Sequence, residues 1–349
     1  MSGLEIIDLT APSAPGAGFL GASLIPTRAL MLLYLRARLA DGREVAVIHA
    51  PERSLVPGLL DGGAADFQGN ASFSFGGAVL APFANRIRGR FDAASRSIET
   101  SIAGHRLRLP ANGGGAAPGA ERYAIHGRIL ATPVTGLQVQ PGSASGVIDA
   151  GDFGVGWPSS TRLGISWTLS AVALTLRVEA SNVGREPTPI GLGWHPYFAL
   201  PSGQRAQARL RLPASARLPV NDYDEVLPTG QVLPVAGTSF DFRGGAALGD
   251  RYLDDCFTAL DRNAEGAVVC EVIDAAAAYG LRVTSTSPHI RAVQTFTAPG
   301  RPFVVVEPQF NLANPYGAEW GGRETGMVLL PPGATVSYDA TLTLFTPSA

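Results

Sequence analysis

One histidine of this chain lies in a strongly apolar segment. Residues 191–200 read GLGWHPYFAL and place His195 between a Trp and a Pro-Tyr-Phe run, although the chain has only five histidines. This histidine could be a core residue whose ring bonds a backbone carbonyl, or a proton donor in a sugar site lined by aromatic rings. Because the ordinary pKa of imidazole lies near 6.5, the side chain can take or release a proton close to neutral pH.

A glutamate ends an apolar run in the C-terminal part of the chain. The run Val304, Val305 and Val306 leads into Glu307, which Pro308 follows. A run without polar alternation is typical of a strand covered on both faces. A carboxylate at its end would be partly desolvated, which raises its pKa and suits it to act as a general base at neutral pH. A turn-capping or ion-paired glutamate is the alternative.

Three further segments carry polar side chains that could contact a ligand. Residues 81–91, APFANRIRGRF, include Asn85, Arg86 and two more arginines beside aromatic residues, but an exposed cationic strand would look the same. His126 precedes a glycine in YAIHGRIL, where a structural histidine is the simpler interpretation. Asp254 begins an acidic pair in RYLDDCFTAL, and such pairs often form turns. Taken singly, none of these segments decides a function.

The composition excludes several kinds of chemistry and partner. All 27 basic residues are arginine, which excludes a Schiff-base lysine, a pyridoxal phosphate lysine and a P-loop lysine. A net charge of −2 gives no electrostatic reason to expect nucleic acid or an anionic membrane surface. Two cysteines, Cys256 and Cys270, are too few for a disulfide framework or a four-thiolate metal site.

The sequence also lacks targeting and membrane signals. The first residues, MSGLEIIDL, have no basic region of the kind that begins a signal peptide. The apolar window ALMLLYLRARL is interrupted by Arg36 and Arg38 and is too short to span a bilayer. We therefore expect a cytoplasmic protein.

The elements that must position these residues are short strands. Residues 335–345, TVSYDATLTLF, alternate apolar and polar side chains, which indicates a half-buried antiparallel strand. Residues 34–50, YLRARLADGREVAVIHA, predict a hairpin closed by Asp41 and Gly42. Many glycines and prolines separate such segments, and no long segment has a helical period. We predict a mostly β fold, one large antiparallel β-sandwich domain spanning residues 1–349.

In their order, these segments resemble the aldose 1-epimerase (galactose mutarotase) family. The resemblance runs from FGGAVLAPFANRIRGRF through the HG dipeptide, SNVGREPTPIGLGWHPYFAL, LPTGQVLPVAGTSFDFR and LDDCF to VVVEPQ, and so covers most of the chain. It implies a galactose mutarotase-like supersandwich with a sugar-binding cleft and no cofactor. It also implies an isomerase of carbohydrate metabolism that interconverts the α and β anomers of an aldohexose.

The resemblance implies three catalytic residues. Glu307 would take the proton of the anomeric hydroxyl, His195 would protonate the ring oxygen, and His126 would be a second histidine near that oxygen. The chemistry needs no more than an acid and a base, because one proton leaves O1, another arrives at O5, and the ring then closes on its other face. A well-placed pair gives about 10²–10⁴-fold acceleration per proton transfer.

Five further residues form the substrate-binding set. The resemblance implies that Arg86 orients sugar hydroxyls, Asp254 binds a ring hydroxyl and Gln309 adds a hydrogen bond. We add Asn85 from the arginine-rich segment and Trp194 as part of an apolar wall for the sugar. Alternation along an extended segment puts Trp194 and His195 on opposite faces, so some of these aromatic residues belong to the core.

Alternatives remain open. The forms HGR and GWHPYF depart from those of many free-sugar mutarotases, and four arginines (Arg86, Arg88, Arg122 and Arg128) could bind a hexose 6-phosphate or a sulfosugar. A non-catalytic carbohydrate-binding sandwich is another possibility. A cupin-like metal site could be built from His126, His195 and Glu307, although we expect no metal. The expected partner is a monosaccharide, and the expected state is a monomer or homodimer.

Overall fold

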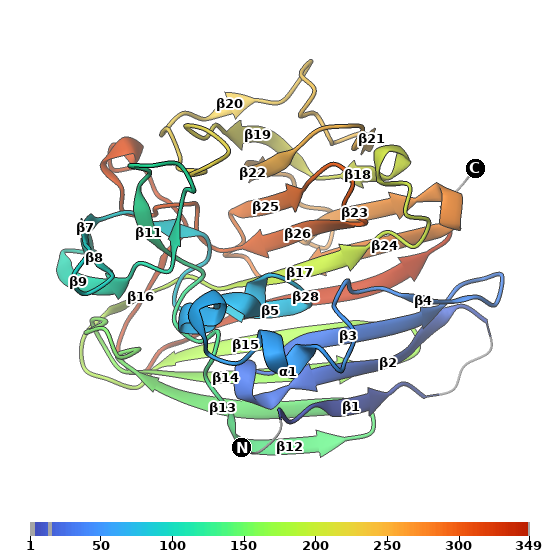
Figure 1. The fold of residues 1–349 in the computed structure, drawn as a ribbon, viewed down its shortest axis with the longest axis horizontal. Coiled ribbons are helices and arrows are strands. Elements are labelled where there is room, and N and C mark those ends of the chain that lie inside the picture. The colour runs from blue at the N-terminus through green and yellow to red at the C-terminus, as the bar shows by residue number, and fades with distance from the viewer. Residues whose placement is uncertain (1–3, 13–15, 348–349) are drawn as a thin grey trace.

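The computed structural model describes residues 4–12 and 16–347, so parts of the N-terminal segment and of the expected 1–349 domain lie outside the described residues. Two large sheets of antiparallel strands face each other across one extended apolar core (Figure 1). The prediction of a mostly β, antiparallel sandwich is confirmed.

The first sheet carries most of the predicted site residues, and we call it the site sheet. Among the described residues it has eleven strands, with β4 (Glu44–Ala46) paired only to β3. The other strands lie in the order β1 (Ile7–Thr10), β2 (Gly18–Ile25), β3 (Met31–Arg38), β5 (Gly77–Leu80), β17 (Gly193–Ala199), β26 (Phe303–Gln309), β25 (Ala292–Thr297), β22 (Leu253–Leu260), β19 (Ala214–Leu218) and β20 (Leu233–Pro234). The central strands thus bring distant parts of the sequence side by side.

The second sheet has nine strands within the described part of the chain. Their order is β12 (Thr135–Gln140), β13 (Ser143–Gly151), β14 (Thr161–Leu169), β15 (Leu174–Asn182), β28 (Thr335–Phe345), β24 (Tyr279–Ser285), β23 (Val268–Asp274), β18 (Arg209–Arg211) and β21 (Ala246–Ala247). The predicted strand over residues 335–345 is β28. Its Val336, Tyr338, Ala340 and Leu342 are buried in the core, as the alternation predicts.

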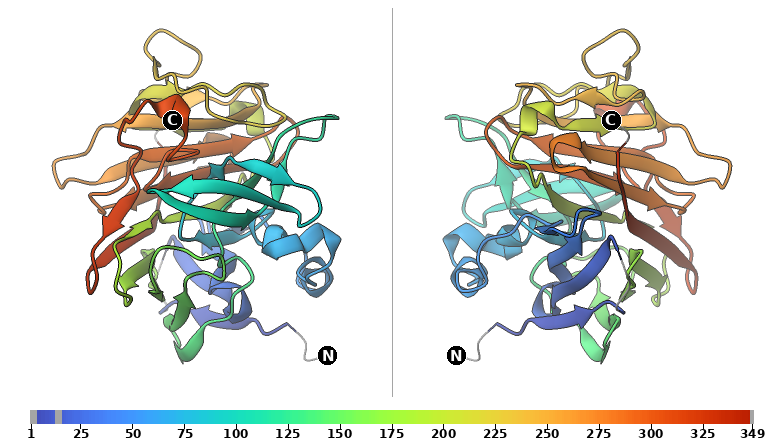
Figure 2. Two further views of the ribbon diagram at one scale, coloured as in Figure 1. Left: turned by 90° about the vertical axis from the view of Figure 1, so that its left-hand side faces the viewer. Right: turned by 90° about the vertical axis from the view of Figure 1, so that its right-hand side faces the viewer.

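Smaller sheets and short helices complete the fold (Figure 2). The sheets are β10 (Gly113–Gly114) with β11 (Arg122–Ile125) and β6 (Arg86–Ile87), β7 (Arg90–Asp92) with β8 (Ser97–Ile102) and β9 (His105–Pro110), and β16 (Thr188–Ile190) with β27 (Val328–Leu330). The helices are α1 (Val56–Leu59), η1 (Pro26–Arg28), η2 (Ala64–Phe73), η3 (Arg205–Gln207), η4 (Ala275–Ala277) and η5 (Ala318–Trp320). In the described residues we find no helix of sufficient length and apolarity to cross a membrane.

The core explains the two patterns that stand out in the sequence. Trp194 of β17 meets Trp167 of β14 across the sandwich, with ring centroids 5.5 Å apart. Every residue of β26 is buried, which confirms that the valine run is a strand covered on both faces. The strand does not end at Glu307 but continues to Gln309, so the carboxylate lies within it. The predicted hairpin is formed by β3 and β4, with Gly42 at a φ of +87°.

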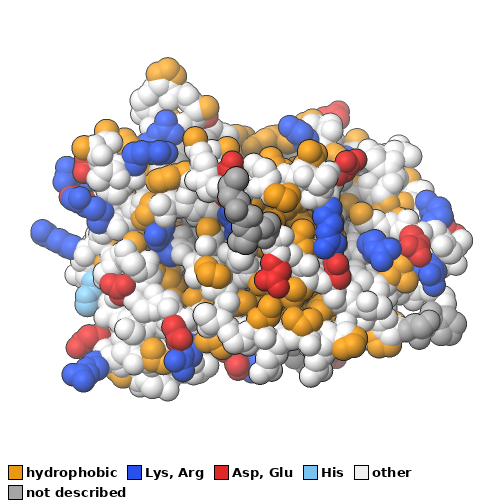
Figure 3. Space-filling model, turned by 60° about the horizontal axis from the view of Figure 1, so that its bottom comes forward, with side chains coloured by type: hydrophobic (Ala, Val, Ile, Leu, Met, Phe, Trp, Pro, Cys, Tyr) orange, Lys and Arg blue, Asp and Glu red, His pale blue; other side chains and the backbone are white. Residues whose placement is uncertain are grey.

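Surface charge is largely paired. On the face shown in Figure 3, acidic and basic side chains lie interspersed among apolar ones. Exposed arginines commonly lie against carboxylates, as Arg53 does with Asp8 (3.1 Å) and Arg162 with Asp149 (2.6 Å). Such pairing is in keeping with the small net charge of −2.

Candidate active site

Neighbouring strands of the site sheet align two of the predicted residues, His195 and Glu307, in one row. In the register of β17 with β26, Gly193 pairs with Gln309 and Tyr197 pairs with Val305. His195 therefore lies opposite Glu307. On the other side of β26, Gln294 of β25 pairs with Glu307, and Cys256 of β22 pairs with Gln294. Because side chains alternate between the faces of a sheet, residues paired in this way point to the same face.

A second row lies two residues further along the strands. It reads Tyr197, Val305, Phe296 and Asp254 across β17, β26, β25 and β22. Residues of the intervening positions, such as Val306, belong to the core between the sheets. The site sheet therefore has one apolar face toward the second sheet and one mixed face that holds the predicted site.

The third ionisable residue arrives on a tight turn. His126 follows β11 with a φ of +59°, and its backbone N–H donates to the carbonyl oxygen of Asn85 at 2.9 Å. Gly127 has a φ of +78°, and a Cβ there would lie 2.1 Å from the carbonyl oxygen of Ala81. Only glycine fits at this approach, which is the physical reason for the His-Gly dipeptide.

Together these elements form what we call the ionisable cluster, namely His126, His195 and Glu307. Nε2 of His195 lies 3.6 Å from Oε2 of Glu307, and the two imidazole rings meet edge to face with centroids 4.9 Å apart. All three side chains are nearly or fully withdrawn from solvent. Residues separated by 181 positions in the sequence (126 to 307) are thus brought within contact range.

A polar network borders the cluster. The Arg86 guanidinium lies 3.1 Å from Asp254 and donates to Oδ1 of Asn85 at 3.2 Å. Gln294 donates to Asp254 at 2.6 Å and accepts from Nδ2 of Asn85 at 2.9 Å. Gln294 was not among the predicted residues, although a single amide in the strand AVQTFT, on the same face as apolar Ala292 and Phe296, is a signal of a polar site.

Aromatic rings enclose the two histidines. The Phe73 ring lies with its centroid 4.8 Å from that of His126 and 6.2 Å from that of His195. Tyr197 lies 5.2 Å from His195, and its hydroxyl donates to the carbonyl oxygen of Phe73 at 2.8 Å. Phe73 was not among the predicted residues, because nothing in its local sequence indicates that it lies against residues 126 and 195.

Trp194 does not lie in this site. Its ring is fully buried between the sheets against Trp167 and Phe198, and its Nε1 donates to the carbonyl oxygen of Gly77 at 3.1 Å. The prediction that Trp194 helps to bind substrate is therefore wrong. The reason is the alternation of β17, which turns Trp194 toward the core and His195 away from it.

Gln309 lies on the same face as Glu307, two residues along β26. Its Nε2 donates to the carbonyl oxygen of Asn311 at 2.7 Å, and the side chain is fully buried. Its Oε1 has no hydrogen-bond partner among the described residues. The hydrogen bond to Asn311 therefore fixes the side chain, and Oε1 remains available as an acceptor.

Burial shifts the protonation of the cluster. It raises the pKa of Glu307 well above its ordinary value, and nearby Asp254 adds to this while Arg86 opposes it. Burial also lowers the pKa of His195 to about 4. A hydrogen bond to the residue's own backbone raises this pKa, and the positive charge of Arg86 lowers it. The pKa of His126 falls well below its ordinary value through burial, His195 and Arg86. In the unliganded protein the imidazoles are therefore neutral at pH 7.

Buried polar atoms without a hydrogen-bond partner gather at this place. Within the described residues they include both carboxylate oxygens of Glu307, Nδ1 of His126, Nδ1 of His195 and Nε of Arg86. Unsatisfied buried polar atoms are rare in folded proteins because each costs desolvation free energy. Their accumulation around one cluster indicates a site that binds a polar ligand.

The same cluster is the best candidate for a metal site. One ligand atom from each of its three residues lies within 4.8 Å of the others, and two imidazoles with a carboxylate can bind zinc or iron. Ligand atoms around a tetrahedral zinc lie closer, at roughly 3.4 Å from one another. The Arg86 guanidinium also acts on all three groups electrostatically, and its positive charge opposes a dication. The residues therefore fit proton transfer better than metal binding.

The arginines considered for an anionic sugar differ in their surroundings. Arg86 pairs with Asp254, and Arg88 pairs with Glu121. Arg128 donates to Oε1 of Gln68 at 2.7 Å. The charges of Arg86, which belongs to the polar network, and of Arg88, two residues further along the chain, are thus compensated by carboxylates.

The chain matches known proteins over most of its length. The family model described as aldose 1-epimerase matches residues 51–343. Galactose mutarotase of Mus musculus is 30% identical over 198 residues, covering 54% of this chain and 51% of the mouse protein, and that of Homo sapiens is 28% identical over 192 residues with the same coverage. The matched region therefore spans about half the length of these curated relatives.

Solved structures share the fold. An aldose epimerase homologue from C. elegans superposes with a TM-score of 0.73 at 17% identity, covering 99% of this chain and 100% of that one. A galactose mutarotase-like protein from Clostridium acetobutylicum has a TM-score of 0.73 at 18% identity, with the same coverage. With the family match over residues 51–343, the chain belongs to the aldose 1-epimerase family.

Proposed function

We propose that this protein is an aldose 1-epimerase that interconverts the anomers of a neutral aldohexose by acid–base chemistry, without a cofactor. The observation that carries the proposal is the buried couple of His195 and Glu307, 3.6 Å apart, with unpartnered polar atoms on both side chains. A carboxyl and an imidazole so placed can serve O1 and O5 of one pyranose, because these two oxygens are bonded to the same carbon.

The couple works with a single proton. To open the ring, Glu307 takes the proton of the anomeric hydroxyl while His195 gives a proton to O5. The open aldehyde then turns about its C1–C2 bond, and the reverse transfers close the ring on the other face. Each cycle returns the proton to its starting position, so the reaction consumes nothing.

The shifted pKa values change the expected starting state. The ordinary pKa of imidazole suggests a protonated histidine as the acid, but burial lowers that of His195 to about 4 and raises that of Glu307. In the unliganded protein the shared proton therefore resides on Glu307, and it must move to His195 before a cyclic sugar opens. Nε2 and Oε2 lie 3.6 Å apart, so the transfer requires the two groups to approach slightly or one water to bridge them. His126 remains neutral and donates a hydrogen bond toward the ring oxygen.

The polar network supports a neutral substrate. Arg86 can offer the remaining donors of its fork to sugar hydroxyls, while Asp254 and Gln294 hold its plane in place. Because Asp254 already compensates the charge of Arg86, the network favours hydroxyls over a phosphate or sulfonate. A non-catalytic sugar-binding protein would not need two ionisable groups held within 3.6 Å of each other at a desolvation cost.

The test is anomer exchange in freshly dissolved α-glucose and α-galactose, followed by NMR, with glucose 6-phosphate in the same panel. We expect the wild type to accelerate exchange of the neutral sugars, and Glu307→Gln to lower kcat/KM by about 10²–10⁴-fold, because the amide cannot take the O1 proton. Glu324→Gln is the matched control, since Glu324 is 77% exposed and lies outside the cluster.

Three results would contradict the proposal. Anomer exchange by Glu307→Gln at the wild-type rate would show that Glu307 is not the base. A kcat/KM for glucose 6-phosphate far above that for neutral sugars would identify an anionic substrate. Sugar binding without any acceleration by the wild type would indicate a binding protein.

A further inference from the structure

We propose that Asn311 is a positioning residue for the reaction, which together with Asn314 fixes the backbone that carries Arg86. The inference rests on the proposed function, because it concerns how Arg86 is oriented toward the hydroxyls of the sugar. It extends that function to residues 311–314, for which the sequence motifs imply no role.

The amide of Asn311 takes the place of a neighbouring strand beside Ala84. Its Oδ1 accepts from the backbone N–H of Ala84 at 3.1 Å, and its Nδ2 donates to the carbonyl oxygen of Ala84 at 2.8 Å. Nδ2 also donates to the carbonyl oxygen of Leu312 at 2.9 Å. The side chain is fully buried, so the loss of any of these bonds would leave a polar group without a partner away from water. The amide therefore specifies one arrangement of the two segments.

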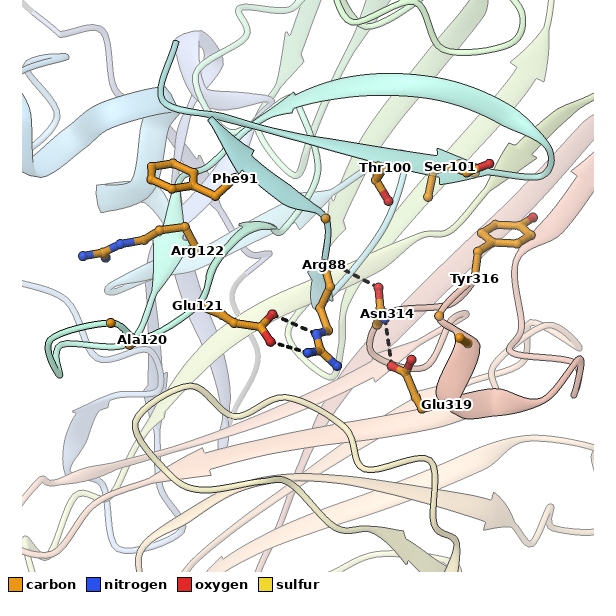
Figure 4. Close-up of a pocket in the computed structure, with 15 residues that line it drawn as sticks. Arg88, Phe91, Thr100, Ser101, Ala120, Glu121, Arg122, Asn314, Tyr316 and Glu319 are labelled. Carbon is orange, nitrogen blue, oxygen red and sulfur yellow. Dashed lines mark hydrogen bonds and ion pairs between the residues drawn. The ribbon is translucent and has the colours of Figure 1, made fainter. Parts of the chain in front are cut away.

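Asn314 continues these contacts along the same segment. Its backbone N–H donates to the carbonyl oxygen of Arg86 at 2.6 Å, and its Oδ1 accepts from the backbone N–H of Arg88 at 2.9 Å. Figure 4 shows the side chain of Asn314 between Arg88 and Glu319, to which its Nδ2 donates at 2.8 Å. Every second residue from 84 to 88 is thus bonded to one of the two asparagines.

The backbone next to Arg86 needs such support. Asn85 has a φ of +60°, in the left-handed region that few residues other than glycine, asparagine and aspartate adopt. A residue in this region keeps its conformation only where the surrounding structure fixes it. Asn311 binds the residue before Asn85 and Asn314 the residue after it, while the carbonyl oxygen of Asn85 accepts from the backbone N–H of His126. Because Arg86 follows this turn directly, the direction of its guanidinium depends on these contacts.

The segment that holds Arg86 also carries the proposed base. Asn311 lies four residues after Glu307, and its carbonyl oxygen accepts from Nε2 of Gln309 at 2.7 Å. A Cβ at Gly191 would lie 2.0 Å from Oδ1 of Asn311, so only glycine fits beside the amide. One short, closely packed segment therefore links the carboxylate of Glu307 to the backbone that carries the guanidinium.

The first experiment measures anomer exchange of glucose by Asn311→Ala. We expect KM to rise by roughly 10-fold or more, because a positioning group displaced by about 1 Å can cost up to about 10²-fold. The value of kcat should change less, since the register that pairs His195 with Glu307 is retained. A KM within about twofold of wild type would overturn the proposal.

Asn182→Ala is the matched control. Asn182 is 1% exposed and lies at the end of β15 in the second sheet, where its Nδ2 donates to the carbonyl oxygens of Glu186 and Leu330 at 2.8 Å each. Its removal takes away a similar buried amide far from Arg86 in the fold. We expect a lower Tm for both alanine variants, but a KM within about twofold of wild type for Asn182→Ala alone.

A double-mutant cycle separates positioning from a general structural role. In an Arg86→Ala background, Asn311→Ala should change KM by less than about twofold, because the side chain that it orients is absent. Its effect on Tm should persist in that background. An equal rise in KM with and without Arg86 would overturn the proposal, since Asn311 would then act through the fold as a whole.

A second variant serves if Asn311→Ala does not fold. Asn314→Gly keeps the backbone N–H that binds Arg86 and suits the φ of +48°, but it removes the acceptor for the N–H of Arg88. We expect KM to rise by roughly 3–10-fold, and only where Arg86 is present. Melting curves identify the folded variants.

A binding readout distinguishes this inference from the proposed function. The sugar 1,5-anhydroglucitol has no anomeric hydroxyl and cannot open, and its Kd is measured by calorimetry. We expect each asparagine variant to weaken this binding by the factor that raises its KM. Wild-type Kd values in both variants would overturn the positioning role, even with glucose exchange intact. A wild type that leaves glucose exchange unaccelerated would instead refute the proposed function, while weaker binding by the variants would still support the positioning role.

Discussion

At the scale of single residues, burial shifts the pKa values of the ionisable groups in opposite directions. It raises the pKa of Glu307 and lowers that of His195, so both groups are disfavoured in their charged forms. Two neighbouring titratable groups shifted apart by their surroundings are typical of an acid–base site. The result is a couple in which a single proton resides on Glu307 rather than on His195.

The first prediction concerns the acid limb of the activity. As the pH falls toward about 4, His195 takes a second proton onto a couple that already holds one on Glu307. The doubly protonated couple has no base for O1, so kcat/KM should decline toward this pH and stay level above it up to the raised pKa of Glu307. A pH profile of anomer exchange, corrected for the uncatalysed rate, checks this. A decline centred near 6.5 would show instead that His195 keeps its ordinary pKa.

The second prediction concerns stability. The folded pKa of Glu307 lies above its unfolded value, so ionising it opposes folding, and stability is lost as the pH rises through that folded value. Glu307→Gln removes the ionisation and should raise Tm at pH 8 by roughly 2–4 °C, with a smaller difference at pH 4. Calorimetry at both pH values checks it. Equal Tm values at pH 8 would mean that the carboxylate is not penalised by its burial.

At the scale of elements, strand register assembles the site. His195, Glu307 and Gln294 share a row only because β17, β26 and β25 pair in one register, and a slip by one residue would turn each side chain into the core. The sheet thereby lines up an imidazole, a carboxylate and an amide from three separate segments. Rigid strands, rather than loops, hold the reacting couple.

The third prediction concerns the turn that presents His126. In Gly127→Ala the new Cβ would collide with the carbonyl oxygen of Ala81, and φ is +78° there, so the turn must shift. We expect the loss of stability to exceed about 1 kcal/mol, together with a lower kcat/KM because His126 moves. Gly136→Ala is the matched control, since its φ is +59° with open space around the Cβ. Equal effects of the two substitutions on urea unfolding and exchange would contradict the steric argument.

At the scale of the whole molecule, the sandwich separates stability from chemistry. The core packs one face of the site sheet on the second sheet, while the other face carries the ionisable cluster. Trp167, on the second sheet, contacts Trp194 directly behind His195 and donates from Nε1 to the carbonyl oxygen of Leu30 at 2.9 Å. The second sheet therefore supports the row from behind, through the contact of Trp167 with Trp194.

The fourth prediction follows from this division. Trp167→Ala should destabilise the protein by about 3–5 kcal/mol in urea unfolding, because it leaves a cavity in the core. At a temperature where the variant is folded, KM for glucose should remain near the wild-type value, since no ligand contact is lost. A large rise in KM with little loss of stability would mean that the core residue acts on the site directly.

The sequence by itself determined the strands and several residues of the site. Alternation predicted β28 and the β3–β4 hairpin, and the valine run predicted a strand buried on both faces, because these patterns depend on neighbours along the chain. The ordered motifs pointed to the family and to His126, His195 and Glu307. The order of the motifs was needed for these residues, because taken singly none of the segments decides a function.

Only the tertiary structure decided which side chains meet. It placed Trp194 in the core and brought Gln294 and Phe73 to the cluster. These outcomes depend on strand order and register, which join segments far apart in the sequence. The lowered pKa of His195 has the same origin, because burial by distant residues, rather than its neighbours along the chain, removes the water that would stabilise its charge.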